Sequence, residues 1–110
     1  PELVRDPVVC ESWASLQGDG ERSTLCAPPA SVTARMQNTQ RQTMAAIAGG
    51  MDNVHVFDPT RHLLLDGRVR HRDSEGKVLY SDNHHLSVSG SRLLAVPFQG
   101  FLQEKGLARP

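Results

Sequence analysis

A long helical pattern, closed by two glycines and followed at once by a short β-type run, most constrains the fold of this chain. Over residues 30–48, apolar side chains recur near helical spacing, two prolines precede the run and two glycines follow it. Residues 53–58, "NVHVFD", then form a β-type run that ends in a polar residue before Pro59. This order predicts an α/β fold with parallel strands, in which Met36 and Met44 fill the core.

The remaining segments predict shorter elements around this unit. The N-terminal segment is irregular, and we expect a short helix around residues 11–17. The Asp-Gly pair at 66–67 is a hairpin signal, which predicts two or three short strands in that region. Residues 87–105 place apolar side chains on one face of a final helix, with Ser87 or Ser89 as its N-cap.

The composition narrows the classes of partner. The 110 residues suffice for one domain or part of one, and 12 basic residues balance 12 acidic residues. Because the net charge is zero, there is no broad electrostatic argument for nucleic acid, and we expect no nucleic-acid partner. No apolar run approaches the roughly 18 residues of a membrane span. The chain begins with Pro1 rather than Met, so we expect a piece of a longer protein.

Two cysteines, Cys10 and Cys26, are separated by a segment that contains a Gly-Asp-Gly turn. In an oxidising compartment they would close a disulfide worth about 3 kcal/mol. In a reducing compartment they would remain two free thiols, and the residues alone leave both readings open. A metal site is less favoured, because neither cysteine belongs to a CxxC pair.

The stretch "YSDNHHLSVSG", residues 80–90, places an aspartate three residues before a histidine. A neutral imidazole is the natural general base near pH 7, provided that an acceptor fixes its tautomer. If the chain turns, the carboxylate of Asp82 accepts a hydrogen bond from Nδ1 of His85, and Nε2 points outward. Ser87 would then cap the following helix and hold the turn.

The same stretch also has simpler interpretations. Aspartate, asparagine and serine before a helix are ordinary capping and turn residues. A metal site formed by Asp82, His84 and His85 is weaker still, because adjacent residues seldom point at one ion, so we expect no metal and no cofactor. The other histidines, at positions 55, 62 and 71, are isolated in the sequence.

The stretch "LYSDNHHLSVSGSRLL", residues 79–94, resembles the C-terminal signature of SGNH-type hydrolases. It is most similar to the SGNH domain fused behind the membrane-embedded acyltransferase-3 module of bacterial surface-polysaccharide O-acyltransferases. The matching positions are Tyr80, Asp82, His85-Leu86-Ser87, Gly90 and Leu93-Leu94. "VHVFDPT", residues 54–60, is similar to the step that leads into this signature, and the resemblance covers roughly Cys10 to Leu102.

The resemblance implies the C-terminal portion of a flavodoxin-like, three-layer α/β SGNH fold. Residues 1–110 would form the C-terminal part of a single domain, with 1–27 irregular and 28–110 carrying the regular elements. The family's catalytic aspartate and histidine fall on Asp82 and His85. His84 stands where the subgroup often has asparagine, so it is expected to be a neighbour of the base. A further cysteine pair of the subgroup is replaced here by leucine and valine residues, Leu64, Leu65 and Val69.

The nucleophile that the resemblance calls for does not appear in this stretch of chain. The family's serine lies in a Gly-Asp-Ser motif after the first strand, whereas "QGDGERS", residues 17–23, has Gly20 at the serine position. We therefore expect the serine block and its oxyanion hole upstream of Pro1, and we expect these 110 residues alone to be inactive.

The implied activity of the parent protein is O-acyl transfer, with acetyl as the expected group, onto hydroxyls of bacterial cell-surface glycans. The expected partners are an acyl donor, a glycan acceptor, the N-terminal part of the SGNH domain and the membrane acyltransferase module. The implied location is the periplasm or the extracytoplasmic face of the inner membrane, which agrees with a Cys10–Cys26 disulfide. An esterase of the same fold, and a non-catalytic module in which "DNHHLS" only caps a helix, remain open.

Overall fold

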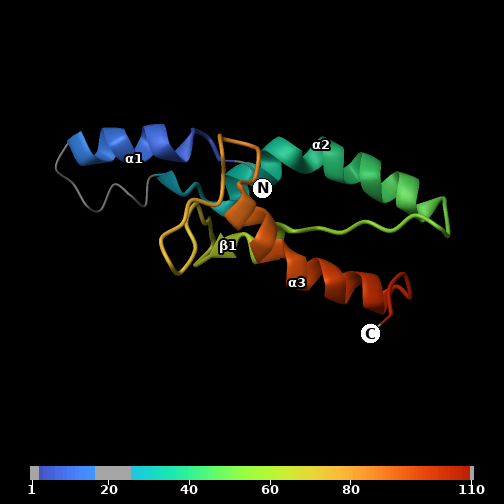
Figure 1. Ribbon diagram of the computed structural model, residues 1–110. Helices are drawn as coiled ribbons and strands as arrows, with labels where there is room; N and C mark the ends of the chain where they lie inside the picture. The colour runs from blue at the N-terminus through green and yellow to red at the C-terminus, as the bar shows by residue number, and fades with distance from the viewer. Residues whose placement is uncertain (1–2, 17–25, 110) are drawn as a thin grey trace.

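The computed structural model describes residues 3–16 and 26–109, which form helices and a small antiparallel sheet (Figure 1). The elements are α1 (Pro7–Leu16), α2 (Ala30–Gly49), the 3₁₀ helix η2 (Thr60–His62), β1 (Leu64–Leu65), β2 (Arg68–Val69) and α3 (Val88–Glu104). None of the helices in these two ranges is long and apolar enough to cross a membrane. This mixture of helix and strand agrees with the α/β class, although two strands do not form a three-layer fold.

Helix α2 confirms the predicted helix to within one residue at its C-terminal end. It begins after Pro29, whose extended backbone (φ −57°, ψ 143°) precedes the first turn, and Gly50 caps its end. The prediction that its methionines fill the core is wrong, because Met36 and Met44 are 54% and 43% exposed. Only Thr33 of this helix is buried, since the chain that returns from α2 covers little of its apolar face.

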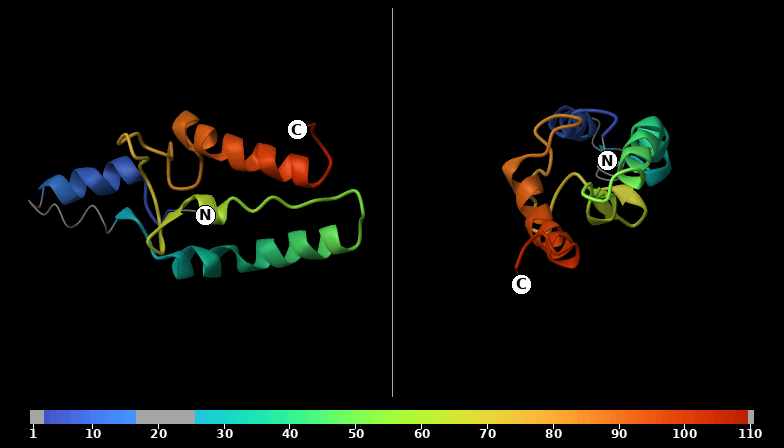
Figure 2. Two further views of the ribbon diagram at one scale, coloured as in Figure 1. Left: turned by 90° about the horizontal axis from the view of Figure 1, so that it is seen from below. Right: turned by 90° about the vertical axis from the view of Figure 1, so that its right-hand side faces the viewer.

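The predicted parallel strand at residues 53–58 is not formed. The chain from 54 to 59 has no regular element, and no strand of the described residues lies beside it. A parallel strand requires a neighbouring strand to complete its hydrogen bonds, so the local β preference is not enough. The segment instead runs back between α2 and α3 (Figures 1 and 2), and the ring of Phe57 lies 5.2 Å from that of Phe98.

The predicted hairpin is confirmed in β1 and β2. Leu64 pairs with Val69 and Leu65 with Arg68 in an antiparallel register. The turn residues Asp66 and Gly67 both have positive φ, at 51° and 73°, as a type I′ turn requires.

The hairpin also fixes the start of α2. The N–H of Val69 donates to the carbonyl of Pro28 at 2.9 Å, and the N–H of Ala30 donates to the carbonyl of Gly67 at 2.9 Å. The side chain of Arg68 adds a hydrogen bond from Nε to the carbonyl of Ala27 at 2.9 Å. These bonds join the hairpin to the chain just before the helix.

Helix α1 begins four residues earlier than predicted, because Asp6 caps it. Oδ1 of Asp6 accepts the N–H groups of Val8 and Val9 at 2.9 and 3.1 Å. A disulfide joins Cys10 of this helix to Cys26, with 5.6 Å between the Cα atoms. The helix is therefore tied covalently to the segment that leads into α2.

An ionic contact also holds α1 against the chain that follows the hairpin. The carboxylate of Glu11 accepts a hydrogen bond from Nε of Arg72 at 2.7 Å and lies 2.7 Å from Nε2 of His71. The Arg72 hydrogen bond and charge, with a further contribution from His71, hold the pKa of Glu11 below its usual value despite partial burial. This ionic contact thus joins α1 to the segment that follows the hairpin.

The core of the described residues is small and lies beneath the N-terminal end of α3. Its buried members come from separate segments and are Leu3, Val69, Leu79 and Tyr80. Leu64, Leu86 and Leu93 pack against this cluster and are partly buried. The core therefore joins the N-terminal segment, the hairpin and the first turns of α3.

Gly90, in the first turn of α3, lies directly against the backbone of Leu79. A Cβ atom built at position 90 would stand 2.1 Å from the Leu79 carbonyl oxygen, far inside van der Waals contact. Gly100 of the same helix has no atom within 4 Å of its equivalent position. Of these two glycines of α3, packing therefore requires glycine at position 90 alone.

We expect Gly90→Ala to lower the free energy of unfolding by about 2 kcal/mol, because the methyl group must push α3 away from Leu79. Gly100→Ala is the matched control in the same helix and should raise stability by up to about 1 kcal/mol through helix propensity. Chemical denaturation of the two variants measures both values. Equal stability of the two variants would contradict the close packing of α3 on Leu79.

Candidate active site

The motif of residues 80–87 forms a closed turn that leads into α3. Tyr80 and Leu86 form an antiparallel bridge, and the N–H of Ser81 donates to the carbonyl of His85 at 2.9 Å. The carbonyl of Asn83 accepts the N–H of Leu3 at 2.7 Å, which ties the tip of the turn to the N-terminal segment. The tip of the turn, residues 82–85, is thus fixed by the bonds at its base and by the bond from the N-terminal segment.

Ser87 joins this turn to the helix, as its predicted role as N-cap requires. Its Oγ accepts the N–H of Gly90 at 3.1 Å and donates to the carbonyl of Val78 at 2.6 Å. Its own N–H donates to the carbonyl of Leu79 at 2.9 Å. Since these bonds satisfy the Ser87 hydroxyl, the side chain serves the fold of the turn and is not a nucleophile.

The carboxylate of Asp82 accepts three hydrogen bonds within the turn. Oδ1 accepts the backbone N–H groups of His84 and His85 at 2.8 and 2.7 Å. Oδ2 lies 2.7 Å from Nδ1 of His85, so the structure brings together the two residues that the sequence selected. With Asp82 ionised, Nδ1 of His85 carries the proton and Nε2 has a free lone pair.

The Nε2 atom of His85 is open to a substrate. The His85 side chain is 67% exposed, and within residues 3–16 and 26–109 Nε2 has no hydrogen-bond partner. A general base must reach the proton that it removes, and this nitrogen faces solvent with its tautomer fixed by Asp82. The arrangement is therefore suited to proton transfer at Nε2.

The same hydrogen bonds keep Asp82 ionised. The N–H of His84, followed by the ring and the N–H of His85, holds the pKa of the Asp82 carboxyl well below its usual value of 3.8. A depressed pKa means that these bonds stabilise the folded state above pH 3.8, and that this contribution is lost as the pH falls through the depressed value. Asp82 therefore remains an acceptor for His85 across the neutral range.

His84 lies closer to this pair than the sequence suggested. Its ring centroid is 4.0 Å from that of His85, with 45° between the ring planes. Its Nδ1 lies 2.9 Å from Oδ1 of Asn83 and 3.5 Å from Oδ1 of Asp82. One ligand atom from each of Asp82, His84 and His85 falls within 4.8 Å of the others, so these three residues are able to hold a metal ion. In this turn the two adjacent histidines therefore lie near one carboxylate, contrary to the expectation that adjacent residues seldom point at one ion.

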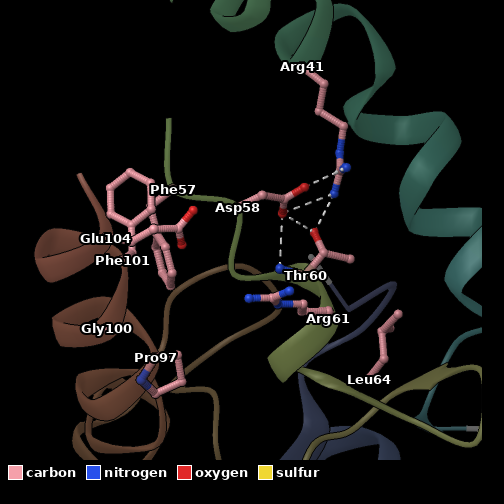
Figure 3. Close-up of a pocket in the computed structure, with 10 residues that line it drawn as sticks. All are labelled: Arg41, Phe57, Asp58, Thr60, Arg61, Leu64, Pro97, Gly100, Phe101 and Glu104. Atoms are coloured by element: carbon pink, nitrogen blue, oxygen red, sulfur yellow. Dashed lines mark hydrogen bonds and ion pairs between the residues drawn. The ribbon is translucent and has the colours of Figure 1, made fainter. Parts of the chain in front are cut away.

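A second feature, which the sequence did not single out, is a cavity of about 720 Å³ between α2, η2 and α3. Figure 3 shows Arg41, Asp58 and Thr60 linked on one side, with Phe57 and Phe101 across the cavity. Nη1 of Arg41 lies 2.8 Å from Oδ2 of Asp58, whose Oδ1 accepts the N–H of Thr60 at 2.9 Å. In the sequence, Asp58 stood out only as the polar residue that ends the run at 53–58 and as part of the "VHVFDPT" similarity.

Asp58 is held ionised by the same means as Asp82. Burial acts to raise the pKa of Asp58, but the hydrogen bonds from Thr60 and the charge of Arg41 outweigh burial and hold that pKa below its usual value. The group thus fastens the segment before η2 to α2.

The sequence also contains a Gly-Asp stretch and isolated histidines, none of which was assigned to the site. The "QGDGERS" stretch, residues 17–23, lies outside the described residues. Among the isolated histidines, His71 contacts Glu11, and the ring of His62 stacks on that of Phe57 with centroids 6.2 Å apart. The described residues therefore provide the Asp82–His85 pair with no adjoining serine nucleophile.

We expect the Asp82 carboxyl to titrate below its usual 3.8 in the folded protein, as carboxyl-detected NMR would measure. His85→Ala removes one of the three donors, so the pKa of Asp82 should rise but remain below 3.8, since the backbone donors persist. The same carboxyl in urea-unfolded protein serves as the control. A folded-state midpoint at or above the unfolded one would contradict the hydrogen-bonded turn.

Comparison with known proteins identifies a family for this chain. The family model described as "SGNH domain (fused to AT3 domains)" matches residues 3–100, which include α1, α2, the hairpin, the Asp82–His85 turn and most of α3. No curated protein and no solved structure matches the chain. The match extends over most of the 110 residues, so the chain belongs to the family of SGNH domains that are fused to AT3 domains.

Proposed function

We propose that the Asp82–His85 pair supplies the acid–base part of a Ser-His-Asp triad in an O-acyltransferase. The observation that carries the proposal is the 2.7 Å contact between Asp82 Oδ2 and His85 Nδ1, with Nε2 of His85 open to solvent. Membership in the family of SGNH domains fused to AT3 domains supports an acyltransferase-associated role. The serine and the oxyanion hole would come from residues outside those described.

Each atom of the pair has a distinct part in this mechanism. Nε2 of His85 accepts the proton of an attacking hydroxyl, and the imidazolium that forms keeps its hydrogen bond from Nδ1 to Asp82. The carboxylate stabilises this charge and prevents the ring from turning. When the acyl group leaves its donor, Nε2 returns the proton to the departing oxygen.

The proposed substrates are an acyl group, acetyl first of all, and a hydroxyl of a bacterial cell-surface glycan. The AT3 module named in the family description would be the membrane partner that delivers the acyl group. We place this domain on the extracytoplasmic side of the membrane. The Cys10–Cys26 disulfide supports that placement, since such bonds persist in oxidising compartments.

Hydrolysis is the second candidate function, and the exposure of the His85 ring favours it. A side chain that is 67% exposed is accessible to water as well as to a sugar hydroxyl. Transfer and hydrolysis differ only in which hydroxyl takes the acyl group. The ratio of acylated glycan to free acid, measured with the full-length protein, separates the two.

A purely structural role for the turn is the third candidate. Ser87 caps α3 and Asp82 bonds the backbone of the turn, which is what a non-catalytic helix entry also needs. Neither of these bonds requires an imidazole at position 85. The identity of residue 85 therefore distinguishes a catalytic turn from a structural one.

We expect His85→Ala in the full-length protein to lower glycan acylation by about 10³-fold, because the general base is lost. His84→Ala is the matched control at the neighbouring exposed position and should retain activity within about threefold. Thermal unfolding should show similar midpoints for both variants, since both rings are at the surface. Equal losses of activity would contradict the assignment of His85 as the base, and full activity in His85→Ala would favour the structural role.

A further inference from the structure

The tip of the turn brings three potential metal ligands together. We propose that Asp82, His84 and His85 bind a divalent transition-metal ion of the zinc type, and that the bound ion prevents His85 from acting as a base. The binding part of this proposal depends only on the geometry of the turn. The inhibitory part rests on the proposed function of His85.

The spacing of the ligand atoms fits a tetrahedral ion. Zinc binds nitrogen and oxygen ligands at about 2.0–2.2 Å, so two ligands of one tetrahedral ion stand about 3.3–3.5 Å apart. Oδ1 of Asp82 and Nδ1 of His84 are separated by 3.5 Å, and one ligand atom of His85 lies within 4.8 Å of both residues' ligand atoms. The Asp82–His84 separation already matches a coordination edge, whereas the ligand atom of His85 must come to about 3.5 Å from the other two.

The backbone of the turn explains why adjacent histidines converge here. Oδ1 of Asp82 accepts the consecutive N–H groups of His84 and His85 at 2.8 and 2.7 Å, so the chain curls around the carboxylate. Both rings then extend from the curled segment on the same side, with centroids 4.0 Å apart. Two vicinal histidines on an extended strand would instead point to opposite faces.

The chemistry of the ligands selects the class of ion. Two imidazole nitrogens and one carboxylate oxygen suit zinc, copper or nickel, whereas magnesium and calcium prefer oxygen ligands alone. Three protein ligands leave one position for water. The side chains of Asp82, His84 and His85 are 39%, 50% and 67% exposed, so an ion reaches them without any opening of the fold.

Binding must replace two existing contacts, which limits the affinity. Nδ1 of His84 leaves Oδ1 of Asn83, now 2.9 Å away, and Nδ1 of His85 separates from Oδ2 of Asp82 beyond its present 2.7 Å. We therefore expect a reversible site and not a structural one.

The ion would change the tautomer of His85. In the metal-free pair the proton is on Nδ1 and the lone pair is on Nε2. When the ion takes the lone pair of Nδ1, that proton leaves to water, and a neutral ring must carry its single proton on Nε2. One proton is released and one is taken up, so the charge of the ring is unchanged, but Nε2 has become a donor and no longer accepts a proton.

Calorimetric titration of the untagged protein with zinc chloride tests the binding. We expect one ion per chain, and His84→Ala should weaken the binding at least tenfold because it removes one of three ligands. His55→Ala is the matched control, since this exposed histidine lies outside the cluster. Magnesium chloride should give no saturable binding. Undiminished zinc affinity in His84→Ala, or no zinc binding at millimolar concentration, would overturn the site.

Nitrogen-15 NMR of the histidine rings gives a readout that needs no enzyme activity. Zinc should move the ring proton of His85 from Nδ1 to Nε2, and a spectrum that keeps the proton on Nδ1 at saturating zinc would overturn the proposed coordination.

Zinc should also inhibit glycan acylation by the full-length protein, and less so in His84→Ala. If zinc binds and changes the tautomer while activity is unaffected, His85 is not the base and the metal site stands. If His85→Ala is inactive but zinc does not bind, His85 is the base and the metal site is wrong.

Discussion

The backbone of Leu79 is the point on which the rest of this structure depends. Its N–H donates to the carbonyl of His71 at 2.8 Å, and its carbonyl accepts the N–H of Ser87 at 2.9 Å. That carbonyl also lies against Gly90, which has no side chain to keep α3 away, while the leucine side chain is fully buried. One residue thus links the chain after the hairpin, the turn that carries the site, and the helix behind it.

The turn positions its carboxylate by hydrogen bonds and not by burial. The Asp82 side chain is half-buried, and three donors, two of them backbone N–H groups, fix its orientation. Backbone donors cannot rotate away as side chains do, so the carboxylate keeps Oδ2 directed at the His85 ring. Asp58 likewise accepts a local hydrogen bond, from the N–H of Thr60, although its ionic partner Arg41 comes from α2.

The predictions that depend on neighbouring residues were confirmed, whereas those that depend on distant partners were not. The ends of α2, the Asp66-Gly67 turn and the serine cap of α3 were predictable, because proline, glycine and serine act on the backbone next to them. The D-x-x-H spacing likewise predicted the contact between Asp82 and His85, which are three residues apart. The parallel strand at 53–58 and the buried face of α2 were wrong, because both require distant partners that local patterns do not specify. The approach of His84 to the pair was missed, since it depends on the curl of the backbone around Asp82.

The contacts that form the site join residues close together in the sequence. The formation of the site therefore depends on other residues than its position in the molecule does. The hydrogen bonds of the Asp82 carboxylate span two and three residues, and those of the Ser87 hydroxyl span three and nine. The Asp82–His85 geometry therefore needs little more than residues 78–90, together with the contact from Leu3 to Asn83. The disulfide, the hairpin and α2 instead decide where this turn stands within the molecule. Changes in those distant elements should leave the pair intact and displace it as a unit, so that they affect how a substrate meets His85 and not the chemistry at its ring.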